Sequence, residues 1–159
     1  MGHVMFTNLK CVTHNKTIVE FQSCEIKAFN RTHKYINIHA KNINGKNVTN
    51  AIVNMKLLRF NNGYKPFLVN VTFDVCKFLK NQNHPIVNLI FKPIKSYTNL
   101  NHSCPYNDDI IVDKFWTGNH DVEFLKYLPI PNGDYILAIT LYVNNTELIS
   151  TYTYVRLTS

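Results

Sequence analysis

The stretch KPFLVNVTFDV, residues 65–75, decides the fold of this chain. Its apolar side chains fall on every second position, at Phe67, Val69, Val71, Phe73 and Val75. The positions between them are mostly polar, and Leu68 is the exception. Because successive side chains of a β-strand point to opposite faces, this period of two predicts a strand with one buried and one solvated face.

The same alternation recurs along most of the chain. It is clear in residues 36–40, 51–57 and 135–143, and residues 148–157 are rich in the β-formers Thr and Tyr. Residues 6–13 and 19–29 are predicted to form a first hairpin. Turn sequences such as Asn44-Gly45 and 131–134 (Pro-Asn-Gly-Asp) separate the runs. This spacing predicts a mainly β protein, an antiparallel sandwich of about seven or eight strands.

One segment departs from the strand pattern. Apolar residues at Val75, Phe78 and Leu79, and again at residues 86, 89, 90 and 94, follow a helical spacing. Pro85 suits the first position of a helix, and Pro93 is expected to kink or end the second piece early. We therefore predict one or two short helices near residues 74–95.

The length of 159 residues suits a single domain, and 45% hydrophobic residues are enough to build its core. We expect residues 6–159 to form one β-sandwich domain. Residues 1–5 are expected to be an expression remnant or the N-terminus of the mature chain.

Cysteines and glycosylation signals indicate the compartment. The four cysteines are accompanied by six Asn-x-Ser/Thr sequons, at Asn15, Asn30, Asn47, Asn70, Asn101 and Asn144. An even cysteine count with such sequons is typical of secreted proteins, so we expect an extracellular glycoprotein whose signal peptide has been removed. Of the three possible pairings, we favour Cys11–Cys24, across the first hairpin, and Cys76–Cys104, which closes the helical segment.

Other classes of function find little support in the sequence. The net charge of +7 is spread along the chain without a basic run, so nucleic-acid binding is not expected. No apolar stretch is long enough to span a membrane. Catalytic motifs and zinc-ligand spacings are missing, and the loop pair Asp108-Asp109 reads as a polar loop end more readily than as a cation site. We expect no enzyme, cofactor or metal.

Five phrases, taken together, resemble a known family. They are FTNLKC (6–11), NGYKPFL (62–68), DVCKFLKN (74–81), NLNHSCPYN (99–107) and YLPIPNGDY (127–135). They are similar to a large insect family of small secreted proteins, a domain of unknown function that includes the CheB chemosensory proteins. That family is distantly similar to the ML lipid-recognition domains, which implies an immunoglobulin-like β-sandwich with a hydrophobic ligand between its sheets.

The resemblance implies a secreted carrier of a hydrophobic small molecule, such as a lipid, a fatty acid or a cuticular-hydrocarbon-like pheromone. Its pocket wall is expected from the inner faces of the strands, at Val53, Met55, Leu57, Val69, Val71, Phe73, Leu137 and Ile139. The helical segment could form the mouth, where Lys77, Lys80, Lys92 and Lys95 would attract an anionic headgroup; the alternative is that these lysines simply form the solvated faces of the helices.

A second hypothesis needs no ligand. The chain would be an extracellular glycoprotein, an accessory subunit of a receptor or ion channel, as the CheB resemblance also implies. This hypothesis predicts a filled core and an exposed aromatic patch, for which residues 115–116 (Phe-Trp) and Tyr127 are candidates.

Overall fold

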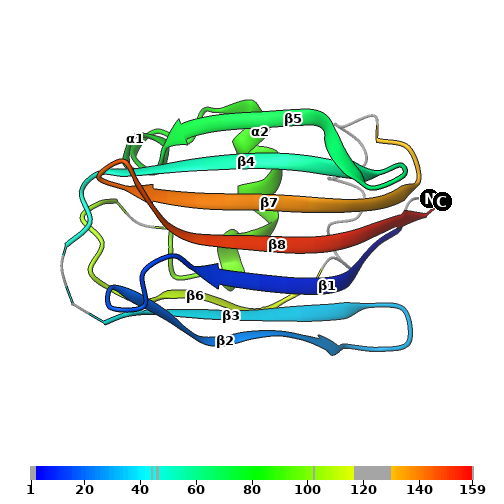
Figure 1. The fold of residues 1–159 in the computed structure, drawn as a ribbon, viewed down its shortest axis with the longest axis horizontal. Helices are drawn as coiled ribbons and strands as arrows, with labels where there is room; N and C mark the ends of the chain where they lie inside the picture. Colours follow the sequence, from blue (N-terminus) through cyan, green and yellow to red (C-terminus); the bar gives the residue numbers. More distant parts are fainter. Residues whose placement is uncertain (1–2, 44, 46, 102, 117–129, 159) are drawn as a thin grey trace.

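The computed structural model describes residues 3–43, 45, 47–101, 103–116 and 130–158. Within these residues, eight β-strands and two short helices make up the fold (Figure 1). The strands are β1 (His3–Thr13), β2 (Val19–Ala28), β3 (Lys34–Asn42), β4 (Ala51–Phe60), β5 (Tyr64–Asp74), β6 (Ile110–Phe115), β7 (Gly133–Val143) and β8 (Thr146–Thr158). The helices are α1 (Val75–Lys80) and α2 (Pro85–Ile94), and a short 3-10 helix, η1 (Lys95–Tyr97), follows α2.

The strands form two antiparallel sheets. The first contains five strands in the order β1-β8-β7-β4-β5, and the second contains three in the order β2-β3-β6. The prediction of a mainly β sandwich with two short helices is therefore confirmed. No helix among the described residues is long and apolar enough to cross a membrane.

The sandwich begins earlier in the chain than the boundary we predicted at residue 6. Strand β1 starts at His3, and His3, Val4 and Met5 pair with the end of β8. Val4 is only 5% exposed, because it packs into the core beside Leu157. Residues 3–5 thus belong to the domain.

The predicted first hairpin is wrong. Strand β1 pairs with β8 and strand β2 pairs with β3, so the turn between β1 and β2 carries the chain from one sheet to the other. Thr13 Oγ1 donates a hydrogen bond of 2.7 Å to the carbonyl oxygen of Val19 across this turn. Alternation reveals that a segment is a strand, but it does not identify the strand's neighbour.

Strand β5 shows why its sequence alternates. Asn70 and Thr72 lie on the outer face, where Asn54 Nδ2 donates to Asn70 Oδ1 at 2.9 Å and to Thr72 Oγ1 at 3.0 Å. Leu68 breaks the pattern because it has a positive φ of 61° at an irregularity in the β4–β5 register, which leaves its side chain 65% exposed.

The helices connect the far edges of the two sheets. Asp74 caps α1 by accepting a hydrogen bond of 3.1 Å from the backbone nitrogen of Lys77. Pro85 occupies the start of α2, as predicted, but Pro93 does not end the helix early: α2 runs to Ile94 and continues as η1. Ile86, near the start of α2, packs against the cluster around Tyr135 in the five-stranded sheet.

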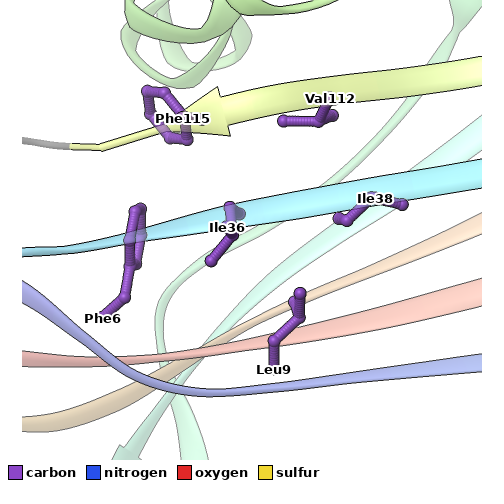
Figure 2. Packing of buried hydrophobic residues seen from close by; sticks show 6 residues of the cluster. All are labelled: Phe6, Leu9, Ile36, Ile38, Val112 and Phe115. Carbon is purple, nitrogen blue, oxygen red and sulfur yellow. The ribbon is translucent and has the colours of Figure 1, made fainter. Parts of the chain in front are cut away.

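The end of α2 meets a different cluster, in which both sheets take part. Figure 2 shows its buried members, Phe6, Leu9, Ile36, Ile38, Val112 and Phe115. Ile94 and Tyr97 pack against this cluster from the helical side. Fully burying one such side chain contributes about 1.5–3 kcal/mol, so this contact holds the two sheets and α2 together.

Candidate functional site: a cavity between the sheets

A cavity of about 750 Å³ lies between the two sheets. Its walls are mostly aliphatic: Val53, Leu57, Leu137 and Ile139 of the five-stranded sheet, Ile36, Ile38 and Val112 of the three-stranded sheet, and Ile90 and Ile94 of α2. Ligand pockets typically measure about 300–1,000 Å³, so this volume suits a small organic ligand.

The predicted wall residues divide into two groups. Val53, Leu57, Val69, Leu137 and Ile139 line the cavity. Met55 is buried but does not line it, and Val71 and Phe73 pack beneath the helices instead. The ring of Phe73 lies 5.6 Å from that of Phe78 in α1, edge to face. The helices therefore cover the end of β5 that we had assigned to the pocket.

The other half of the wall was not foreseen. It comes from β2, β3 and β6 of the three-stranded sheet and from the inner face of β8, including Thr151 and Thr153. The alternation of residues 36–40 was a signal for part of it, because it shows one apolar face. What the sequence lacked was the information that this face opposes β4 and β7.

We assign the mouth of the cavity to the end of the sandwich where the exposed lining residues gather and three connections meet, which is the left of Figure 1. These connections are the β1–β2 turn, the β3–β4 connection and the β7–β8 turn. The exposed residues of the lining gather there, among the residues described, and they are Asn47, Asp108, Asn144, Thr146 and Glu147. Asn15 and Asn42 are half-buried beside them. The mouth is thus a polar, amide-rich rim on an apolar interior.

Towards the opposite end, the lining residues Val4, Tyr135 and Leu157 are buried. Tyr135 has no exposed surface, and Val4 and Leu157 are 5% and 6% exposed. The hydroxyl of Tyr135 donates a hydrogen bond of 2.6 Å to the carbonyl oxygen of Pro131. Burial raises the pKa of Tyr135, so its hydroxyl remains a neutral donor at physiological pH.

The lysines of the predicted mouth do not line the cavity. Lys77, Lys80 and Lys92 are exposed on the helices, and none of the four lysines lines the cavity. Lys95 Nζ lies 5.8 Å from the centre of the Phe91 ring, outside the lining. The side of α2 that faces the cavity carries Ile90 and Ile94, so the helix closes a flank of the sandwich.

A family model described as "Protein of unknown function (DUF1091)" matches residues 53–137, more than half of the chain. The chain belongs to this family. A search of curated proteins found no match.

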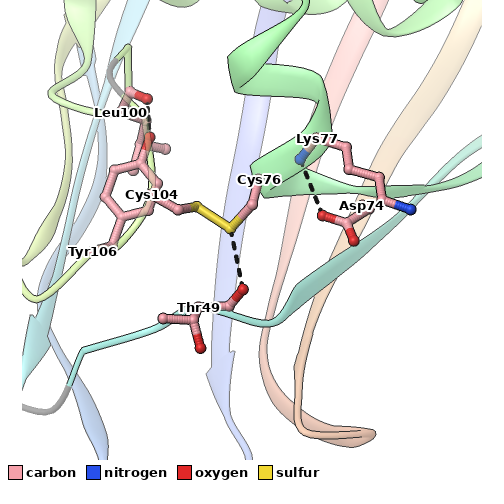
Figure 3. The surroundings of a disulfide bond; sticks show 7 residues. All are labelled: Thr49, Asp74, Cys76, Lys77, Leu100, Cys104 and Tyr106. Atoms are coloured by element: carbon pink, nitrogen blue, oxygen red, sulfur yellow. Dashed lines mark hydrogen bonds between the residues drawn. A yellow bond between two sulfur atoms is a disulfide. The ribbon is translucent and has the colours of Figure 1, made fainter.

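The part that matches the DUF1091 family includes the second disulfide, Cys76–Cys104 (Figure 3). This bond fastens α1 to the segment before β6. The carbonyl oxygen of Thr49 lies 3.5 Å from Cys76 Sγ, and because a disulfide sulfur carries no proton, this is a contact rather than a hydrogen bond. The disulfide thus ties α1 to the segment before β6, and its sulfur also contacts the β3–β4 connection at Thr49.

Backbone hydrogen bonds also join these two segments. Val48 and Tyr106 exchange two of them, with N···O distances of 2.6 and 3.1 Å. The hydroxyl of Tyr106 donates to the carbonyl oxygen of Leu100. The rim residues Asn47 and Asp108 are therefore held by neighbours that are fixed to each other.

The first disulfide, Cys11–Cys24, is the other pairing favoured from the sequence, but its place differs. Cys11 belongs to β1 and Cys24 to β2, so the bond joins the two sheets rather than the two arms of a hairpin. It packs against the core cluster that includes Phe6 and Leu9. This bond fixes the spacing of the sheets on one side of the cavity.

Asp109 has a structural partner. Its Oδ2 lies 2.7 Å from His39 Nε2, and its Oδ1 accepts a hydrogen bond of 2.9 Å from the backbone nitrogen of Asn42. The hydrogen bond from His39, aided by that from Asn42, lowers the pKa of Asp109. Among the described residues, no group of three or more His, Cys, Asp or Glu side chains is arranged to hold a metal ion.

Three of the six sequons lie at the mouth, because Asn15, Asn47 and Asn144 line the cavity. The other three lie outside the lining. Asn30 Oδ1 accepts hydrogen bonds from the 32–33 turn, Asn70 accepts one from Asn54, and Asn101 accepts one from Gln82.

The aromatic patch that the second hypothesis predicts is not formed by Phe115, which is buried at 6% exposure. Trp116 is half-buried and stacks on Phe29, with their ring centres 4.0 Å apart. Phe29 itself is 50% exposed. Tyr127, the other candidate, lies outside the described residues.

Proposed function

We propose that this protein is a secreted binding protein that carries or presents a hydrophobic small molecule between its two sheets. The observation that carries the proposal is the cavity of about 750 Å³. Protein interiors are normally packed as tightly as organic crystals, with few voids larger than a water molecule. A cavity of this size therefore calls for an occupant, and its aliphatic wall calls for an apolar one.

The size of the cavity indicates the size of the ligand. A water molecule takes up about 30 Å³ in the liquid, and a methylene group is of similar size, so 750 Å³ corresponds to about 25 such groups. One long hydrocarbon chain fits this space with room to spare.

The resemblance to the CheB chemosensory proteins and, more distantly, to the ML lipid-recognition domains supports the same proposal. It implies an insect protein that takes part in chemosensation and a ligand such as a lipid, a fatty acid or a cuticular-hydrocarbon-like pheromone. The two disulfides support an oxidising, extracellular location. The alternative, an accessory subunit of a receptor or channel without a ligand, predicts a filled core, and the cavity argues against that.

The first test uses an uncharged probe, N-phenyl-1-naphthylamine, whose fluorescence rises in apolar surroundings. We expect it to bind to protein secreted by insect cells, and we expect native mass spectrometry to show a co-purified small molecule. Val53→Phe places a ring in the cavity wall and should weaken probe binding about tenfold, because it fills the space that the probe needs.

A matched control is available one residue away. Ile52 lies on the outer face of β4, so Ile52→Phe adds the same ring outside the cavity and should leave binding unchanged. No probe binding and no co-purified molecule, in a folded protein, would refute the proposal. Equal losses in the two variants would place the probe elsewhere.

A further inference from the structure

The described lining of the cavity contains no basic side chain. The chain as a whole has 17 Lys and Arg, seven His and a net charge of +7, so this absence is specific to the cavity. The charged residues of the described lining are Asp108 and Glu147, both exposed at the mouth. Lys16 and Lys41 are exposed near the same end of the molecule but do not line the cavity.

This arrangement disfavours an anionic ligand. A carboxylate or phosphate that leaves water needs a cationic partner or several hydrogen-bond donors, and its desolvation is costly without them. Inside this cavity it would find aliphatic side chains and two threonine hydroxyls but no cation, and at the rim it would meet the carboxylates of Asp108 and Glu147.

The wall also offers an uncharged polar site. Thr151 and Thr153 stand on the inner face of β8, and Thr153 is only 8% exposed. Their cross-strand neighbours are Cys11 and Ile139 for Thr151, and Leu9 and Leu137 for Thr153. Within the part of the chain that the structure describes, neither hydroxyl has a hydrogen-bond partner.

Two such hydroxyls on an apolar wall are a recognition feature. Both hydroxyls are accessible rather than sealed in the core, because neither is a buried polar atom without a partner, and a ligand oxygen in the cavity can accept a hydrogen bond from each of them. A strand rises about 3.3 Å per residue, which places Thr151 and Thr153 about 13 and 20 Å along β8 from Glu147 at the mouth. The polar group of the ligand must therefore lie deep in the cavity rather than at the rim.

We propose that the cavity selects an uncharged long-chain molecule with a hydroxyl, ketone or ester group within its chain, and that Thr151 and Thr153 bind this group. This inference rests on the proposed function and names its ligand class. It replaces the anionic lipid that a lysine-lined mouth would have suited.

The experiment compares three ligands with chains of equal length: heptadecane, 9-heptadecanone and heptadecanoic acid. Each displaces N-phenyl-1-naphthylamine from the protein at pH 7. We expect the ketone to bind about three- to tenfold more tightly than the alkane, as one or two hydrogen bonds would produce, and the acid to bind most weakly. In Thr151→Val and Thr153→Val, which keep the shape but remove the hydroxyl, the advantage of the ketone over the alkane should shrink or vanish.

Thr72→Val is the matched control, because Thr72 lies on the outer face of β5 and should leave all three affinities unchanged. Retained binding of heptadecane shows that each variant is folded. Two results would overturn this inference and leave the carrier function standing. In one, the unmodified protein binds the acid most tightly; in the other, the ketone keeps its advantage over the alkane in both inner-face variants. If neither the probe nor any of the ligands binds, the carrier function fails and the inference fails with it.

Discussion

At the scale of single residues, Asp109 links β3 to the segment before β6 through His39 and the backbone of Asn42. Because these hydrogen bonds lower the pKa of Asp109, the ionised carboxylate stabilises the folded state. This contribution is fully present above the unfolded pKa of about 4, and it is lost as the pH falls through the lower folded value.

We expect Asp109→Asn to lower the free energy of unfolding by about 0.5–1 kcal/mol at pH 7, since the pair is partly exposed and screened by solvent. The difference from the unmodified protein should disappear at pH values below the folded pKa. Urea unfolding at several pH values measures this. Asp113→Asn, on exposed Asp113 of β6, is the control, and an equal loss of stability there would contradict the special role of Asp109.

At the scale of elements, the sequence predicted which segments are strands and helices, because each periodicity is a local property. The alternation of β4, β5 and β7 places Val53, Val69 and Leu137 on inner faces, as expected. The β1–β2 hairpin failed for a physical reason: a short turn joins two paired strands and two strands of opposite sheets equally well.

The two disulfides hold different elements, and their removal should separate two properties. Replacing either pair by alanine should lower stability by about 3 kcal/mol, since the bonds close loops with sequence separations of 13 and 28 residues. Removal of Cys76–Cys104 should in addition speed the dissociation of the bound probe, because this bond fastens the segments that frame the mouth.

Urea unfolding gives the stability, and stopped-flow dilution of the complex with N-phenyl-1-naphthylamine gives the dissociation rate. The variant without Cys11–Cys24 is the control, because its stability should be lowered by a similar amount. The same dissociation rate in both variants would show that the second disulfide does not frame the entrance.

At the scale of the whole molecule, the site was harder to predict than the fold. A cavity depends on the distance between two sheets, which is set by the Cys11–Cys24 bond, the common core cluster and α2, and by no local pattern. The four lysines illustrate this: they lie in the predicted helical segment, yet that segment covers a flank while the turns of the sandwich form the mouth.

The arrangement of the sequons gives a prediction at the same scale. Asn15, Asn47 and Asn144 come from three different connections and meet at the mouth. A glycan is bulky and hydrophilic, so chains attached there would restrict passage without touching the apolar interior. We expect glycans at these positions to slow both the entry and the release of a ligand.

The test compares two triple variants of protein secreted by insect cells, after glycan occupancy has been mapped by mass spectrometry. Asn15, Asn47 and Asn144 are changed to Gln in one, and Asn30, Asn70 and Asn101, which lie outside the lining, are changed in the other. The first variant should bind and release N-phenyl-1-naphthylamine faster, with little change in Kd, because a barrier at the mouth affects both rates equally. The prediction fails if the sequons at the mouth carry no glycan, or if both variants bind and release the probe at equal rates. A change in Kd alone would mean that the glycans contact the ligand.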